Sequence, residues 1–199
     1  GLNWYRSLFP TKFMQKKIES EYKKFLTYDV TPFYIYNPLV VDRIFKFSPN
    51  AKIIAVLRNP IDRAYSNYNS KMQGEGDTKT TFEEIINPEI EIIEKNKKNI
   101  DDYAFLVNTF YELLLARGFY AKQLEFWFKK FPRKNILLIS SEELATNTDK
   151  TISEIFEFLE VPIQKISDLT KQNEIKYPKM KDSTREILIN FFKPYNEKL

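Results

Sequence analysis

The sequence predicts an α/β fold with a central, mainly parallel sheet flanked by helices. Two apolar runs, 51–57 (AKIIAVL) and 135–140 (NILLIS), show no alternation with polar residues, which is typical of strands buried on both faces of a parallel sheet. Stretches with helical spacing of apolar residues lie between and after these runs, and such an alternation of strands and helices favours a parallel sheet. Because the chain carries no internal repeat or low-complexity linker, we expect a single domain over residues 1–199.

Each element has a local signal in the sequence. Asn37 and Pro38 form a helix start, with asparagine as N-cap and proline at the first helical position. After Tyr120, apolar residues recur at offsets of 4, 7, 8 and 11, which places them on one helical face and predicts core packing. We expect strands over 24–30, 51–57 and 135–140, an exposed loop over 72–80, and helices over 37–47, 60–72, 81–97, 101–117, 119–131, 149–161 and 182–199.

The composition limits the chemistry of the protein and its surroundings. The chain has no cysteine and no histidine, which excludes disulfides, thiolate metal sites and a histidine base. Acid–base chemistry would therefore use Asp, Glu, Lys or Tyr. No apolar run approaches the roughly 20 residues that span a membrane, and the first residues lack a signal-peptide pattern. We expect a cytoplasmic protein, since a cysteine-free chain suits a reducing compartment.

The net charge of +4 favours anionic ligands. For most individual lysines, a solvated surface position is the simpler interpretation. The basic residues do not gather in a run of the kind that nucleic-acid binders carry, so we expect no nucleic-acid partner.

The stretch 52–68 (KIIAVLRNPIDRAYSNY) places an arginine where a buried strand ends and a helix begins. Asn59 is the predicted N-cap, Pro60 suits the first helical position, and Asp62 at the third can reach back as in a capping box. A helix N-terminus attracts anions, and the planar fork of Arg58 matches phosphate oxygens. These residues predict an anion site at Arg58.

Ser66 lies seven residues after Asn59. That separation is about two helical turns, so we expect its hydroxyl to face the same anion. Arg63 lies one turn into the helix, and we expect it to form a structural ion pair instead. The residues alone leave an alternative open, in which Arg58 is an ordinary charged strand end and Ser66 an ordinary polar residue.

The run LRNPIDRAYSNY resembles the motif with which sulfotransferases that use 3′-phosphoadenosine 5′-phosphosulfate (PAPS) hold the 3′-phosphate of that nucleotide. The family pattern is Arg-(Asn/Asp)-Pro, then Arg, then Ser, after a buried strand. The resemblance implies that Arg58 and Ser66 contact the 3′-phosphate. The segments similar to further parts of the family, above all to bacterial members related to the heparan sulfate enzymes, are 1–10, 28–44, 116–144 and 177–199.

The resemblance implies a three-layer, P-loop-like fold. It also implies a sulfotransferase that moves a sulfuryl group from PAPS to an acceptor hydroxyl or amine, leaving the desulfonated nucleotide PAP and using no metal. The partners would be the nucleotide co-substrate and an acceptor, with no membrane span. The sequence does not specify the acceptor or the oligomeric state.

Two parts of the family pattern have no counterpart in the sequence. One is the 5′-phosphosulfate loop, of the Lys-x-Gly-Thr type, which cradles the sulfuryl-bearing phosphate. The other is the usual catalytic glutamate. Both would precede Gly1, so the domain is expected to lack its N-terminal 5′-phosphosulfate loop segment and to show little transfer activity as it stands.

Two further departures concern individual residues. Asp29, followed by Val and Thr, stands where heparan-type members have Glu-Lys-(Ser/Thr), and the resemblance gives Asp29 a catalytic or supporting role. A simple turn cap is the alternative for Asp29. The family's late Lys-Gly-Arg loop corresponds to 171–178 (KQNEIKYP), which lacks that sequence. Lys176 and Lys171 are the candidate nucleotide contacts there, and a solvated surface position is the simpler interpretation of either.

Two other functions remain open at this level. A P-loop-type kinase for a small metabolite would need a Walker-type lysine loop and a magnesium carboxylate. A non-catalytic module that binds an anionic glycan would show no response to nucleotides.

Overall fold

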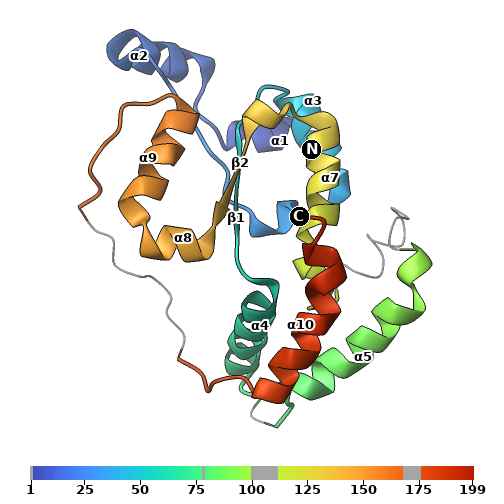
Figure 1. Cartoon of the computed structure of the whole chain (residues 1–199). Coiled ribbons are helices and arrows are strands. Elements are labelled where there is room, and N and C mark those ends of the chain that lie inside the picture. The colour runs from blue at the N-terminus through green and yellow to red at the C-terminus, as the bar shows by residue number, and fades with distance from the viewer. Residues whose placement is uncertain (1, 78, 100–111, 168–175) are drawn as a thin grey trace.

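The computed structural model describes residues 2–77, 79–99, 112–167 and 176–199 (Figure 1). In this part of the chain, a parallel sheet is formed by β1 (Ile53–Leu57) and β2 (Ile136–Ser140). The strands pair in register, from Ile53 opposite Ile136 to Leu57 opposite Ser140. The two apolar runs therefore form the parallel pair that the sequence predicted.

Helices lie on both sides of the strands, so the predicted three-layer arrangement is confirmed (Figure 1). On one side are α3 (Pro38–Phe47) and α7 (Tyr120–Lys130), and on the other are α8 (Ser141–Thr146) and α9 (Thr148–Leu159). The core beneath α3 and α7 contains Val41, Trp127, Phe131 and Ile136. Apolar burial of this kind, worth roughly 25 cal/mol per Å², holds the two helices against the sheet.

A second core lies beyond the carboxyl ends of the strands, among α4, α5 and α10 (Figure 1). These helices span Pro60–Glu75, Phe82–Lys95 and Asp182–Asn196. The 3₁₀ turn Ala116–Gly118 enters this core, and a Cβ added at Gly118 would lie 2.8 Å from both Phe192 and Pro60. Only glycine allows the chain to pass so close to the start of α4.

The first part of the chain makes fewer contacts with the rest. It contains α1 (Leu2–Ser7), α2 (Lys12–Tyr22) and a 3₁₀ turn (Pro32–Tyr34), and α2 has no buried residue. Lys24 and Lys52 attach this part and β1 to the end of α9, where Lys24 Nζ donates to the carbonyl oxygens of Leu159 and Glu160. Further short 3₁₀ turns span Lys97–Asn99 and Arg133–Asn135.

Several predicted elements are confirmed. The Asn37 side chain accepts a hydrogen bond from Leu39 N at 3.1 Å and caps α3. The helical face after Tyr120 is buried as expected, except at Phe128, which is 38% exposed. The helix that begins after Asn59 runs to Glu75, into the predicted loop, and the helix predicted from residue 182 ends at Asn196.

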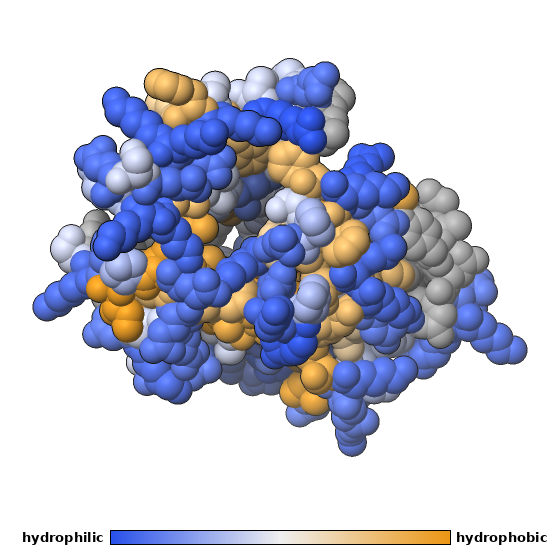
Figure 2. Space-filling model, turned by 90° about the horizontal axis from the view of Figure 1, so that it is seen from above, coloured by the Kyte–Doolittle hydropathy of each residue, from blue (hydrophilic) through white to orange (hydrophobic). Residues whose placement is uncertain are grey.

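Other predictions were wrong. Residues 24–30 form no strand, because they have no neighbouring strand with which to pair in the described part of the chain. β1 is not buried on both faces, since Ile54 and Val56 are 37% and 50% exposed. Seen from above, the molecule is hollowed near its centre, with hydrophobic residues around the hollow (Figure 2). Most of the helix predicted over 101–117 lies outside the described residues, and its end, 116–118, is a 3₁₀ turn.

In the part of the chain that the structure describes, no helix is both long and apolar enough to cross a membrane.

Candidate functional site

A pocket of about 390 Å³ lies where the two parallel strands end. Leu57 and Ser140, which pair across the sheet, both line it, as do residues at the starts of α4 and α8. Asn196 and Leu199 line it from the end of α10. Ligands of open α/β sheets bind outside the carboxyl ends of the strands, so this pocket is the expected place for a site.

Arg58 follows β1 directly, is exposed, and lines the pocket. Among the described residues, its guanidinium makes no ion pair or hydrogen bond. A guanidinium provides five N–H donors and stays protonated at any physiological pH. The side chain is therefore available to an anion in the pocket.

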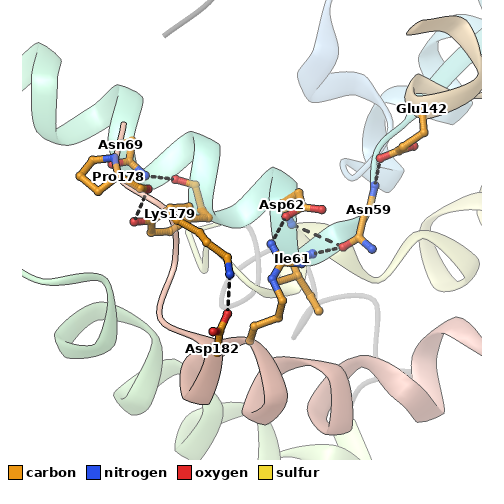
Figure 3. Close-up of polar contacts among 10 residues, drawn as sticks. Asn59, Ile61, Asp62, Asn69, Glu142, Pro178, Lys179 and Asp182 are labelled. Carbon is orange, nitrogen blue, oxygen red and sulfur yellow. Dashed lines mark hydrogen bonds and ion pairs between the residues drawn. The ribbon is translucent and has the colours of Figure 1, made fainter. Parts of the chain in front are cut away.

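Asn59 caps α4 as predicted (Figure 3). Its side-chain oxygen accepts hydrogen bonds from the backbone N–H groups of Ile61 at 3.0 Å and Asp62 at 3.4 Å. The predicted capping box is wrong, because the Asp62 carboxylate pairs with Arg185 of α10 and does not reach back to Asn59.

Glu142 takes the place of Asp62 as the partner of Asn59, whose backbone N–H donates to Glu142 Oε1 at 2.9 Å (Figure 3). The Ser140 hydroxyl donates to Glu142 Oε2 at 2.8 Å. Burial acts to raise the pKa of Glu142, but these hydrogen bonds outweigh it and the pKa lies below its usual value. Sequence reasoning missed Glu142, although an acidic residue in the first turn of a helix that follows a strand is a recognisable signal.

The first backbone amides of α4 are therefore all accounted for. Pro60 has no N–H, Asn59 N–H goes to Glu142, and those of Ile61 and Asp62 go to the Asn59 side chain. Arg63 N–H donates to the Asn59 carbonyl oxygen at 2.9 Å. The helix N-terminus offers no free amide to an anion, so a phosphate here would be bound by side chains.

Within the described residues, the Arg63 side chain does not form the ion pair that the sequence predicted. Its Nη2 donates to the Leu114 carbonyl oxygen, and the guanidinium lies beside the Tyr120 hydroxyl. Burial is the main reason that the pKa of Arg63 is lowered and that of Tyr120 is raised. Arg63 thus attaches α4 to the chain that leads into Gly118.

Glu89 of α5 completes this attachment. Its carboxylate accepts hydrogen bonds from the backbone N–H groups of Leu114 at 2.7 Å and Leu115 at 2.8 Å. Burial raises the pKa of Glu89, and these amides offset only part of that effect. The contacts of Arg63 and Glu89 are therefore structural, and they fix the approach of residues 114–118 to α4.

Ser66 is half-buried in α4, and within the described residues its hydroxyl has no hydrogen-bond partner. It does not line the pocket that contains Arg58. Lys176 lies further away along α4, because its carbonyl oxygen accepts a hydrogen bond from Gln73 Nε2 at 3.4 Å. At 1.5 Å per residue, Gln73 is about 20 Å along the helix from Pro60.

Asp29 lies in a separate cluster of hydroxyl groups. Its carboxylate accepts hydrogen bonds from Tyr5 and Tyr34 at 2.8 Å and from Thr31 at 2.9 Å. Burial acts to raise the pKa of Asp29, but the three hydroxyls outweigh it, so the pKa is lowered. Burial and then the Asp29 carboxylate raise the pKa of Tyr5, which keeps its proton. Of the predicted site residues, only Arg58 lines the pocket.

Comparison with known proteins gives one consistent result. A family model described as "Sulfotransferase domain" matches residues 35–192. The chain is 25% identical to the membrane-associated sulfotransferase kil1 of Dictyostelium discoideum, over 100% of this chain and 55% of that protein. It is 30% identical to human heparan sulfate glucosamine 3-O-sulfotransferase 3B1, over 80% of this chain and 35% of that protein.

A solved structure is also similar. The crystal structure of a sulfotransferase from Alicyclobacillus acidocaldarius superimposes with a TM-score of 0.63 at 29% identity, covering 84% of this chain and 60% of that one. This similarity confirms the predicted P-loop-like α/β fold. The chain spans between 35% and 55% of the length of the two curated relatives named above.

Proposed function

The chain belongs to the sulfotransferase domain family, and on that premise we propose that the pocket at the ends of β1 and β2 receives the 3′-phosphate of PAPS. The reaction would transfer a sulfuryl group from PAPS to an acceptor hydroxyl or amine. The observation that carries the proposal is the unpaired Arg58 guanidinium in a pocket at the carboxyl ends of parallel strands.

The chemistry of the pocket fits a phosphate held by side chains. In the pocket, Arg58 supplies a positive charge with a planar fork. Ser66 lies on α4 outside the pocket lining, and we propose that its hydroxyl, which has no partner among the described residues, reaches the same phosphate. The α4 amides are all occupied, so their hydrogen bonds contribute nothing to the ligand. The helix dipole still favours an anion in front of α4.

In the proposed reaction, PAPS supplies the sulfuryl group, whose bond to the phosphate oxygen breaks as a bond to the acceptor oxygen or nitrogen forms. The acceptor proton goes to a carboxylate, and PAP leaves. Arg58 and Ser66 would hold the nucleotide in place without taking part in the bond exchange. The step needs no covalent intermediate with the protein.

We propose a supporting role for Asp29 rather than that of the main base. Its lowered pKa makes it a weak proton acceptor, and its oxygens already accept from three hydroxyls. As an ionised carboxylate it would fix Tyr5 and Tyr34. Lys176, the candidate nucleotide contact, lies near the other end of α4 from Arg58, and we propose that it contributes little to binding of the nucleotide.

We also propose that residues 1–199 form one domain that holds the 3′-phosphate end of the donor. The sequence contains no Lys-x-Gly-Thr segment, so the 5′-phosphosulfate would be held by residues outside it. The partners would be the nucleotide and an acceptor. A cysteine-free composition supports a cytoplasmic location, although one relative is named as membrane-associated.

Ligand titrations on the unaltered chain test this function against its alternatives. We expect PAP to raise the melting temperature and to bind in calorimetry, with 5′-AMP, which lacks the 3′-phosphate, binding at least tenfold more weakly, about 1.4 kcal/mol. A preference for ATP with magnesium over PAP would support a kinase. Binding of heparin fragments with no response to PAP would support a glycan-binding module.

A further inference from the structure

Glu142 joins the ends of the two strands through one carboxylate. One oxygen accepts from the backbone of Asn59, just after β1 (Figure 3). The other accepts from Ser140, the last residue of β2. Asn59 and Glu142 are 83 residues apart in the sequence, so this carboxylate connects two distant turns. We propose that Glu142 is a positioning residue, which sets the direction in which the Arg58 side chain enters the pocket. This inference rests on the proposed function of Arg58.

Glu142 acts on Arg58 through the peptide unit between Arg58 and Asn59. A peptide unit is planar, so a hydrogen bond that fixes the Asn59 N–H also fixes the plane that contains the Arg58 α-carbon and carbonyl group. The peptide unit that follows the Arg58 α-carbon is therefore held by Glu142, which restricts the direction of the Arg58 side chain.

The charges favour the same arrangement. Glu142 is ionised at neutral pH, since its hydrogen bonds lower its pKa. One of its oxygens accepts from Asn59 and the other accepts from Ser140, and it forms no ion pair with Arg58 in the structure. The guanidinium and the carboxylate line the same pocket, yet the arginine stays available to a ligand. Without its backbone contact, the Asn59 amide would face the pocket unpaired.

The simplest alternative is that Glu142 only stabilises the start of α8. Ser140 caps that helix by accepting from Glu143 N at 3.3 Å, so removing its partner Glu142 disturbs the cap as well. The two roles differ in one respect. Loss of positioning should weaken only those ligands that carry a 3′-phosphate, because it acts through Arg58. Loss of helix stability should weaken the binding of every ligand.

A double-mutant cycle separates them, with PAP and 5′-AMP titrated by calorimetry. Glu142→Ala should weaken PAP binding about tenfold, the size of a lost charged hydrogen bond, and leave 5′-AMP within about twofold. Glu142→Gln keeps an oxygen for the Asn59 amide and should lose less. In an Arg58→Ala background, Glu142→Ala should cause no further loss.

Glu143→Ala is the matched control, because Glu143 is its exposed neighbour and its carboxylate pairs with Lys150 rather than with Asn59. It should leave PAP binding unchanged. Glu142→Asp keeps the charge in the first turn of α8 but shortens the reach to Asn59. It should behave as Glu142→Ala does, and it carries the test if the alanine variant does not fold.

Equal losses for PAP and 5′-AMP, or the same loss with and without Arg58, would overturn the inference and leave Glu142 as a helix-stabilising residue. Unchanged PAP binding in both the Ala and Asp variants, together with a loss in Arg58→Ala, would refute the positioning role alone. Unchanged PAP binding in Arg58→Ala would refute the proposed 3′-phosphate site, and the role of Glu142 with it.

Discussion

The turn after β1 and the cluster around Asp29 distribute their hydrogen bonds in opposite ways. At the turn, the backbone amides of Asn59, Ile61 and Asp62 are all paired, and the Arg58 side chain is left without a partner in the described structure. In the cluster, the charged side chain itself is saturated, because Asp29 accepts from three hydroxyls.

This difference indicates which charge binds a ligand and which holds the protein together. A charged group that has no partner inside the protein gains most from an incoming ion of opposite sign. A carboxylate that is already solvated by protein hydroxyls gains little from a proton or a cation. On this contrast we propose that Arg58 binds the ligand and that Asp29 supports the local structure.

The strongest test of the contrast is Arg58→Ala. We expect PAP affinity to fall by about 2 kcal/mol, roughly thirtyfold, because one charge-assisted contact to the phosphate is lost. Arg58→Lys keeps the charge but not the planar fork, so its loss should be intermediate. Calorimetry measures both variants. Thermal stability should change little, since the guanidinium has no partner in the described part of the protein. Equal PAP affinities for the unaltered chain and both variants would contradict the role of Arg58.

Ser66→Ala should have the next largest effect. A neutral hydroxyl contact to phosphate is worth about 1 kcal/mol, so we expect a loss of roughly fivefold in PAP affinity. The melting temperature should stay the same or rise slightly, because no hydrogen bond within the described residues is removed. Ser70→Ala, one turn further along α4 and exposed, is the matched control. If the two variants bind PAP equally, Ser66 does not contact the 3′-phosphate.

For Asp29, the contrast predicts an effect on stability. The lowered pKa means that ionised Asp29 stabilises the fold above its unfolded-state pKa of about 3.9, and that this contribution is lost as the pH falls through the folded-state value. Asp29→Asn should therefore reduce the free energy of unfolding at pH 7 by somewhat less than about 1 kcal/mol, since the carboxylate is exposed.

Urea unfolding at pH 7 and at low pH measures this difference, which should shrink as the pH falls. PAP affinity should stay within about twofold, well inside one hydrogen bond. A large loss of PAP affinity with unchanged stability would reverse the roles of the two regions.

The sequence was sufficient to predict the turn after β1, but not to predict which distant residues bind to that turn. The apolar runs, Pro60 and the Asn59 cap are local signals, and the strands, the helix start and the place of Arg58 follow from them. Glu142 approaches Asn59 from 83 residues away, and no local pattern shows which distant carboxylate accepts an amide. For the same reason the sequence placed Asp62 at Asn59, when its true partner is Arg185.

The strand predicted over 24–30 failed for a related reason. A strand needs a neighbour, and an apolar or alternating run cannot specify whether one is present. In the structure, Tyr28 and Val30 are 84% and 76% exposed, and β1 itself exposes Ile54 and Val56. Gly118 also depends on the packing. A glycine is needed there because Phe192 and Pro60 approach it closely, and the sequence alone does not show this approach.

Lys176→Ala should have the smallest effect, because it lies outside both regions. Its carbonyl contacts Gln73, about 20 Å along α4 from Arg58's end of the helix, and the side chain is exposed. We expect PAP affinity to change by less than about twofold at 150 mM salt, where charges at such distances are screened. Lys179→Ala, which removes a surface ion pair with Asp182, is the control. A tenfold loss in Lys176→Ala alone would show that the nucleotide extends along α4 and that the segment before α10 covers it.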